Sequence, residues 1–144
     1  MTSTPQIAAN KAIARAFFER FDANDLDGVM ALFAEAATFE VPGKPTEMRS
    51  AGIYDKARIR RLFDRMTSQL PKGLRMSVSL LVGEGDIVIA EATSRGEFAD
   101  GRIYAQRYLT LFRIAGEQIV EVREYNDTLH AHLIWMGAPA RTAS

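Results

Sequence analysis

The feature that most limits the possible folds is a change in the spacing of apolar residues at Pro71 and Gly73. Before this point, apolar side chains recur every three or four residues, which is typical of helices that bury one face. After it, apolar and polar residues alternate, and glycine-containing turns separate the alternating segments. We therefore expect helices first and a run of long antiparallel strands second, which is an α+β order.

The helical segments carry their own start signals. Asn24 or Asp25 can cap a second helix and Asp55 a third, because a side-chain oxygen can accept a hydrogen bond from the free backbone N–H groups of a first turn. Phe17 and Phe21 of the first helix are expected in the core. Predicted helices cover residues 7–21, a short stretch through 29–33, and 55–69; predicted strands cover 37–43, 74–82, 87–98, 102–114 and 118–128, with an irregular loop over 44–54.

Composition limits the partners and the compartment. A chain of 144 residues with 47% hydrophobic content suits one domain, residues 1–144, with a core over about 7–135 and tails at 1–6 and 136–144. Eighteen basic residues balance eighteen acidic ones, which disfavours nucleic acid and anionic membranes as partners. There is no cysteine, and no apolar run reaches the roughly 20 residues of a membrane span, so we expect a cytoplasmic protein without disulfides.

An acidic side chain is predicted to face the core from the last strand. If Val120 and Val122 face inwards, Glu124 and Asn126 do so too, because side chains in a strand repeat every second residue. Burial raises the pKa of a carboxyl group, and a carboxyl tuned in this way can transfer protons near neutral pH. Glu124 is therefore the main functional candidate.

The register of the strands decides which side chains share a face with Glu124. A three-residue connection over 115–117 is preferred, because it pairs Val120 with Phe112 and Tyr108 with Glu124. A connection of two or four residues would turn Glu124 to the opposite face, because one residue of slip exchanges the faces. A two-residue loop at 100–101 would bring five side chains to one face. These are Glu91, Thr93, Tyr104, Tyr108 and Phe112.

Several of these segments resemble a known family. Four segments carry the resemblance. They are the paired aromatics Phe17 and Phe18, the sequence Ala-Thr-Phe-Glu-Val-Pro-Gly at 37–43, the strand at 104–112, and the sequence Gln-Ile-Val-Glu-Val-Arg-Glu-Tyr-Asn-Asp at 118–127. Together they resemble the nuclear-transport-factor-two-like superfamily, and more narrowly its SnoaL-like polyketide cyclase and ketosteroid isomerase-related members. The resemblance implies a cone-shaped, strongly curved, mainly antiparallel sheet on three N-terminal-half helices, with a short C-terminal helix or turn, an apolar pocket and often a homodimer through the outer sheet face.

The resemblance also bears on single residues. It implies that Glu124 corresponds to a catalytic Asp of SnoaL-like cyclases and limonene epoxide hydrolases. The resemblance also implies that the general-base Asp of ketosteroid isomerases corresponds to Val41, that their helical tyrosine falls near Phe17 or Phe18, and that their second acid falls near Thr110. These departures argue against steroid isomerisation by that set of residues.

The predicted site is a pocket without a cofactor or a metal ion. Glu124, Glu91 and Tyr108 are the catalytic candidates, because two acids can move protons and a hydroxyl can donate to a developing enolate. Where the epoxide hydrolases have an Arg and an Asp two residues apart, this chain has Glu91 and Thr93. Alternatively, the two acids, Arg95 and the tyrosine hydroxyls satisfy one another in a structural network. The predicted ligand-binding residues are Phe17, Phe21, Phe39, Val41, Tyr54, Phe63, Thr93, Tyr104, Phe112, Asn126 and Trp135.

Weaker signals come from histidines and from a basic helix. His130 and His132 are two residues apart, so they do not share a helix face and cannot bind a metal ion together. A surface or capping role is favoured, and the alternative is that one of them lines the pocket mouth. The basic residues of the helix at 55–69, which include Arg65, are expected to face solvent.

Two functions remain open on the sequence. The first is a cofactor-independent enzyme of the isomerase, cyclase or dehydratase type that acts on a small hydrophobic carbonyl compound. The alternative is a non-catalytic ligand-binding or dimerisation module of the same fold. A free Glu124 that faces a cavity favours the enzyme, whereas a Glu124 paired with Arg95 favours the module.

Overall fold

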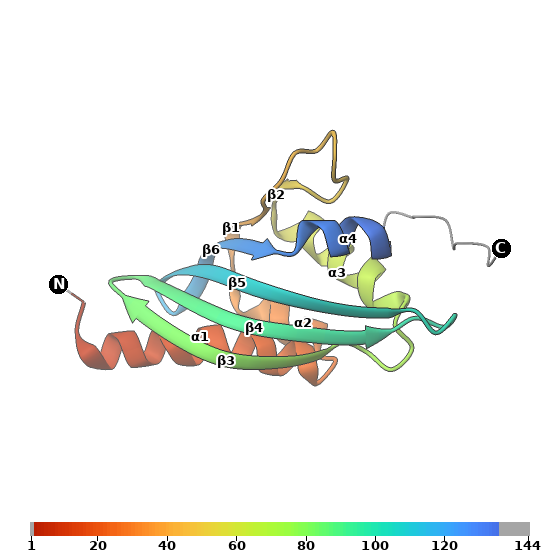
Figure 1. The fold of residues 1–144 in the computed structure, drawn as a ribbon. Helices are drawn as coiled ribbons and strands as arrows, with labels where there is room; N and C mark the ends of the chain where they lie inside the picture. The colour runs from red at the N-terminus through yellow and green to blue at the C-terminus, as the bar shows by residue number, and fades with distance from the viewer. Residues whose placement is uncertain (1, 136–144) are drawn as a thin grey trace.

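The computed structural model describes residues 2–135 and confirms the α+β order, with three helices in the N-terminal half and one short helix after the last strand (Figure 1). The predicted tail at 136–144 lies outside the described residues. The helices are α1 (Thr4–Asp22), α2 (Leu26–Ala31), α3 (Lys56–Ser68) and α4 (Thr128–Trp135). The strands are β1 (Phe33–Val41), β2 (Gly52–Tyr54), β3 (Arg75–Glu84), β4 (Ile87–Glu97), β5 (Ile103–Ala115) and β6 (Gln118–Asn126).

The helix starts follow from their capping residues. Asp25 accepts a hydrogen bond from the Gly28 N–H at 2.8 Å, and Asp55 accepts one from the Arg58 N–H at 2.8 Å, as predicted. Helix α1 begins earlier than predicted, inside the expected tail at 1–6, because the Ser3 side chain caps it and Pro5 suits its first turn.

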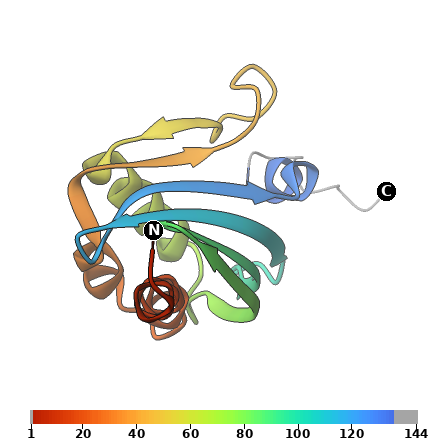
Figure 2. The ribbon, with the colours of Figure 1, turned by 90° about the vertical axis from the view of Figure 1, so that its left-hand side faces the viewer.

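The six strands form one mixed sheet in the order β2-β1-β6-β5-β4-β3. Strands β1 and β6 are parallel, and every other neighbouring pair is antiparallel. Strand β2 occupies the end of the segment predicted as an irregular loop, where Tyr54 pairs with Phe39. Figure 2 shows the sheet curving around α1 and α3, so the concave face of the sheet is covered by helices.

Phenylalanine side chains form the core where the helices meet the sheet. The rings of Phe17 in α1 and Phe112 in β5 lie 5.3 Å apart, and those of Phe63 in α3 and Phe39 in β1 lie 5.5 Å apart. Both pairs are edge to face, the arrangement that the charge distribution of aromatic rings favours. This core fixes the distance between the helices and the concave face of the sheet.

The predicted register of β4 and β5 is wrong by one residue. Tyr108 pairs with Ala92, and Glu91 pairs with Leu109. The cause is the connection between the strands, where the Phe98 N–H donates to the Arg102 carbonyl at 2.9 Å and encloses three residues instead of two. Because one residue of slip exchanges the faces, Glu91 and Thr93 lie on the exposed outer face, opposite to the tyrosines.

The predicted connection of β5 and β6 is also wrong, but the predicted facing of Glu124 survives. Ala115 pairs with Gln118 around a two-residue turn of Gly116 and Glu117, which alone would turn Glu124 outwards. Between the Arg113–Glu121 and Ile114–Ile119 pairs, Val120 is an extra residue that forms a β-bulge and reverses the facing again.

The bulge also changes which residues of β6 enter the core. Ile119 and Val122 are fully buried, whereas Val120, which was expected to face inwards, is only partly buried. Glu124 lies opposite Thr110, and Asn126 lies opposite Tyr108, on the same concave face as Val122.

Candidate functional site

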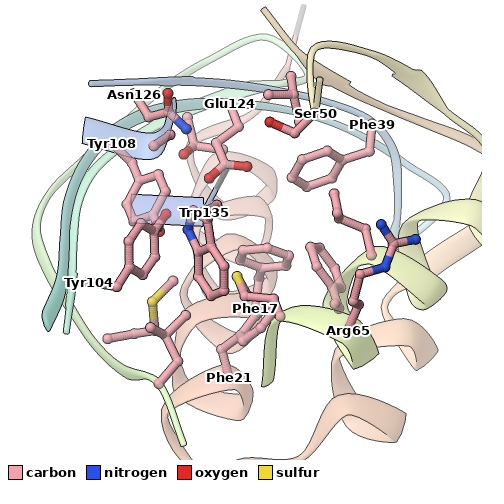
Figure 3. A pocket seen from close by; sticks show the side chains of 18 of the residues that line it. Phe17, Phe21, Phe39, Ser50, Arg65, Tyr104, Tyr108, Glu124, Asn126 and Trp135 are labelled. Atoms are coloured by element: carbon pink, nitrogen blue, oxygen red, sulfur yellow. The ribbon is translucent and has the colours of Figure 1, made fainter. Parts of the chain in front are cut away.

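A cavity of about 290 Å³ lies between the concave face of the sheet and the helices α1, α3 and α4 (Figure 3). This volume is near the lower end of the roughly 300–1,000 Å³ that is usual for small-molecule sites. The apolar side chains in its wall are Phe17, Phe18, Phe21, Phe39, Val41, Leu62, Phe63, Met66, Leu74, Met76, Ala131 and Trp135. The polar ones are Arg49, Ser50, Arg65, Gln69, Tyr104, Tyr108, Thr110, Glu124 and Asn126.

Most of the predicted site residues lie in this wall. They reach it from α1, β1, α3, β5, β6 and α4, so the cavity joins segments from both ends of the chain. Those in the wall are Phe17, Phe21, Phe39, Val41, Phe63, Tyr104, Tyr108, Glu124, Asn126 and Trp135.

Four predicted residues lie elsewhere. Glu91 accepts a hydrogen bond from the Ser79 hydroxyl at 2.8 Å on the outer face, which it shares with Thr93. Phe112 is buried in the core, and the Tyr54 hydroxyl donates to the Ser50 carbonyl at 2.8 Å. Glu91 therefore cannot act on a ligand in this cavity together with Glu124.

Glu124 is the acidic side chain in the cavity wall, and it has no charged or hydrogen-bonding partner among residues 2–135. Arg95 does not reach it, because Arg95 lies on the exposed outer face next to Ala105. Burial away from water raises the pKa of Glu124 to about 8, because desolvation disfavours the charged carboxylate. The carboxyl group is therefore mostly protonated near neutral pH and can exchange its proton with a ligand.

Two tyrosine hydroxyls stand beside this acid in a short hydrogen-bonded chain. The Tyr108 hydroxyl lies 2.9 Å from the Ser94 hydroxyl and 3.1 Å from the Tyr104 hydroxyl. Burial, and then the charge of Glu124, raise the pKa of Tyr104 to about 12. Burial also raises the pKa of Tyr108 well above its ordinary value. Both tyrosines therefore remain neutral and can donate hydrogen bonds.

Asn126 adds an unsatisfied acceptor to the same wall. Its Oδ1 atom is buried and has no hydrogen-bond partner among the described residues. A buried acceptor without a partner costs about 1–3 kcal/mol, which a donor on a bound ligand or a water molecule would recover. Asn126 is two residues from Glu124 on the same face of β6, so one ligand can contact both side chains.

Several site residues were not found from the sequence. The Ser94 hydroxyl is hydrogen-bonded to the Tyr108 hydroxyl. A single serine in β4 does not by itself predict this contact with the neighbouring strand. Arg65 is exposed, as expected of the basic residues of α3, but it also contributes to the cavity wall, which was not predicted. Arg49 and Ser50 belong to the loop between β1 and β2, whose path depends on distant contacts.

His130 supports the wall without entering it. The Ala105 N–H donates to His130 Nε2 at 3.1 Å, and the imidazole stacks on the Tyr104 ring with 5.6 Å between centroids. Asp127 accepts from the His130 N–H at 3.1 Å and so caps α4. The His130 side chain thus contacts Tyr104 and the backbone of β5, a role that was not predicted from the sequence.

Residues 2–135 contain neither a metal-binding cluster nor a membrane-spanning helix. No group of three or more His, Cys, Asp or Glu side chains there could hold a metal ion. Over the same residues, no helix combines the length and the apolar character that crossing a bilayer requires.

Comparisons with known proteins agree with the fold. A family model described as a SnoaL-like domain matches residues 14–122. No curated protein matches the sequence. Three similar solved structures illustrate the fold. The first is an NTF2-like protein of unknown function from Burkholderia pseudomallei, which is 19% identical in sequence and has a TM-score of 0.72; the match covers 86% of this chain and 95% of that chain. IdmH from Streptomyces antibioticus, provisionally assigned as a polyketide cyclase, has 21% identity, 84% and 94% coverage and a TM-score of 0.70. BvnE pinacolase from Penicillium brevicompactum has 14% identity, 86% and 89% coverage and a TM-score of 0.74.

Proposed function

Because this chain belongs to the SnoaL-like domain family, we propose that it is a cofactor-independent enzyme of the isomerase, cyclase or dehydratase type. Its substrate is a small hydrophobic carbonyl compound, and Glu124 moves the proton. The observation that carries this proposal is a carboxyl group in the cavity wall, with a pKa of about 8 and no partner among residues 2–135. Polyketide cyclase and pinacolase assignments among the similar structures agree with this broad class but concern those proteins.

The proposed chemistry starts from the ionised form of Glu124. The carboxylate removes a proton from the carbon next to the substrate carbonyl, and the C–H electron pair forms the C=C bond of an enolate. Negative charge then moves to the carbonyl oxygen, where the hydroxyl of Tyr104 or Tyr108 donates a hydrogen bond. The protonated Glu124 returns the proton to carbon. With a pKa of about 8, about a tenth of the protein carries the reactive carboxylate near pH 7.

Exchange of carbon-bound hydrogen tests this proposal without knowledge of the natural substrate. Hydrophobic ketones such as β-tetralone would be incubated in D₂O with the protein, and deuterium at the carbon next to the carbonyl would be followed by NMR. The Glu124→Gln variant keeps the shape of the side chain but cannot accept the proton, so exchange should slow by about 10²–10⁴-fold. Equal exchange in the variant and the unsubstituted protein would refute the role of Glu124.

A non-catalytic ligand-binding module is the second candidate. The Ser94, Tyr108 and Tyr104 hydroxyls satisfy one another, as a purely structural network would. Such a module would bind hydrophobic ketones without exchanging their hydrogens, and Glu124→Gln would change only the binding constant. Measurement of binding alongside exchange therefore separates the two candidates.

We also propose a homodimer through the outer face of the sheet. Leu80, Leu109 and Tyr125 each keep about half of their surface exposed, at 50%, 49% and 49%. They lie along one line across the sheet, with the exposed Glu91 between Leu80 and Leu109, because Leu80 pairs with Glu91, Glu91 with Leu109, and Leu109 with Tyr125. Half-exposed apolar side chains on the outer face of a sheet are typical of a surface that a second subunit covers.

A further inference from the structure

We propose that the ligand of this cavity carries an acidic group, such as a carboxylate, which Arg49 and Arg65 bind at the cavity mouth. The inference rests on the proposed function for the identity of the site and adds the class of substrate: a hydrophobic carbonyl compound with an acidic group at the far end from the carbonyl.

Two arginines from separate parts of the chain contribute to the cavity wall. Arg65 belongs to α3, and Arg49 to the loop between β1 and β2; both residues are exposed and contribute to the wall. Because both side chains are exposed, we place them at the mouth of the cavity and not in its apolar interior. Arginines that two elements supply to one cavity are suited to an anionic ligand, since a guanidinium can donate two parallel hydrogen bonds to a carboxylate.

Neither arginine is neutralised by the protein. Among residues 2–135, no carboxylate lies within salt-bridge distance of Arg49 or Arg65. Arg60 on the same helix differs, because it pairs with Asp27 at 2.7 Å and with Asp64 at 3.1 Å. The donors of the two cavity arginines are therefore free to bind a ligand.

The polarity of the wall gives the ligand one orientation. Figure 3 shows Arg65 across the cavity from Tyr104 and Tyr108, with aromatic side chains between them. An anion beside the desolvated Glu124 would lose its hydration and repel the ionised carboxyl, whereas an anion at the exposed mouth stays partly hydrated and meets two cations. The acidic group therefore binds at the arginines, and the carbonyl points to Glu124.

A matched pair of fluorescent probes tests this inference. Anilinonaphthalene sulfonate and phenylnaphthylamine share one ring system, and only the first carries an anionic group. Their dissociation constants would be measured by fluorescence titration at low salt. Arg49→Gln and Arg65→Gln should each weaken binding of the sulfonate about three- to tenfold, the double variant more, and binding of the neutral probe less than about twofold.

Arg61→Gln is the matched control. Arg61 is also an exposed arginine of α3, but it does not contribute to the cavity wall. Its substitution by glutamine changes the net charge by the same amount as Arg49→Gln or Arg65→Gln. The control should alter sulfonate binding less than about twofold. Equal losses in the control and the cavity variants, or an unchanged preference for the sulfonate in the double variant, would overturn the inference. Thermal melting of each variant checks that the fold is intact.

Failure of this inference is distinguishable from failure of the proposed function. If Glu124→Gln abolishes hydrogen exchange while the arginine variants leave the sulfonate preference unchanged, only the anion clamp is wrong. If the unsubstituted protein binds neither probe, the cavity does not accept hydrophobic ligands, and both proposals are overturned.

Discussion

At the scale of the residue, one carboxyl group in the cavity wall makes stability depend on pH. Glu124 is desolvated without a compensating cation, so the folded protein holds its proton more tightly than the unfolded chain does. Between the ordinary pKa of 4.5 and the folded value of about 8, the folded state binds more protons than the unfolded state. The contribution of this proton binding to the free energy of unfolding is fully present below pH 4.5 and is lost as the pH rises through about 8.

This linkage predicts how stability depends on pH. The melting temperature of the unsubstituted protein should fall from about pH 5 to pH 9 more steeply than that of Glu124→Gln, because glutamine does not ionise. The variant should be the more stable of the two near pH 9. Calorimetry across this range is the measurement, and parallel curves for the two proteins would show that the pKa of Glu124 is not raised.

The same group predicts the pH profile of the proposed reaction. If the ionised carboxylate removes the substrate proton, the apparent second-order rate of hydrogen exchange should rise about tenfold per pH unit below the pKa and level off near pH 8. A profile that levels off near pH 4 to 5 would assign the proton transfer to a group with an ordinary carboxyl pKa.

The tyrosine hydroxyls predict that one substitution mainly lowers the exchange rate and another mainly lowers stability. Tyr108→Phe removes a hydroxyl from the cavity wall, so exchange should slow about 10- to 100-fold, because a donor to the enolate is lost. Ser94→Ala is the matched control, since it removes one of the two hydrogen-bond partners of Tyr108 and Ser94 does not line the cavity. The control should cost about 1–3 kcal/mol of stability but slow exchange less. Equal slowing in both variants would favour a structural network.

At the scale of the element, the hairpin of β5 and β6 determines that Glu124 lies on the concave face of the sheet. Its turn holds Gly116 at φ 56° and Glu117 at φ 63°, and the bulge at Val120 follows. Left-handed backbone is easy for glycine and costs a residue with a side chain about 1–2 kcal/mol. The two-residue turn fits the twist of the strands, and the bulge then returns Glu124 to the concave face.

This geometry predicts opposite effects for two substitutions in the turn. Glu117→Gly should stabilise the protein by about 0.5–1 kcal/mol, because it relieves the left-handed backbone, and Gly116→Ala should destabilise it by a similar amount. Urea denaturation measures both. A destabilised Glu117→Gly variant would argue against the two-residue turn and hence against the observed register.

At the scale of the whole molecule, the two faces of the curved sheet have different surroundings. The sheet curves around the helices (Figure 2). Its concave face and the helices enclose the cavity, and its outer face carries Leu80, Leu109 and Tyr125. Because side chains alternate along each strand, one strand such as β5 supplies Tyr108 to the cavity and Leu109 to the outer face. Assembly through the outer face would leave the cavity accessible.

The proposed homodimer predicts a change in mass on substitution of the outer face. Leu109→Arg should convert the dimer to a monomer, because two copies would bring buried positive charges together at the interface. Ser68→Arg is the control, since Ser68 is exposed at the end of α3, away from the sheet face. Light scattering coupled to size-exclusion chromatography gives the mass; a monomeric unsubstituted protein would exclude the dimer.

Local sequence determined the elements of this protein and the family fold. Helical and alternating spacing placed the helices and long strands, and Asp25 and Asp55 marked two helix starts, because capping and amphipathic burial act within a few residues. The inward facing of Glu124 was predicted for a partly wrong reason, since a two-residue turn and a bulge replace the expected three-residue connection.

Only the tertiary structure decided which residues meet in the cavity. The loop between β4 and β5 has one residue more than predicted, which moved Glu91 and Thr93 to the outer face, and the parallel pairing of β1 with β6 joins residues about 80 positions apart in the sequence. Arg65 likewise reaches the cavity through the packing of α3. Strand register and side-chain convergence depend on long-range contacts, so local spacing cannot determine them.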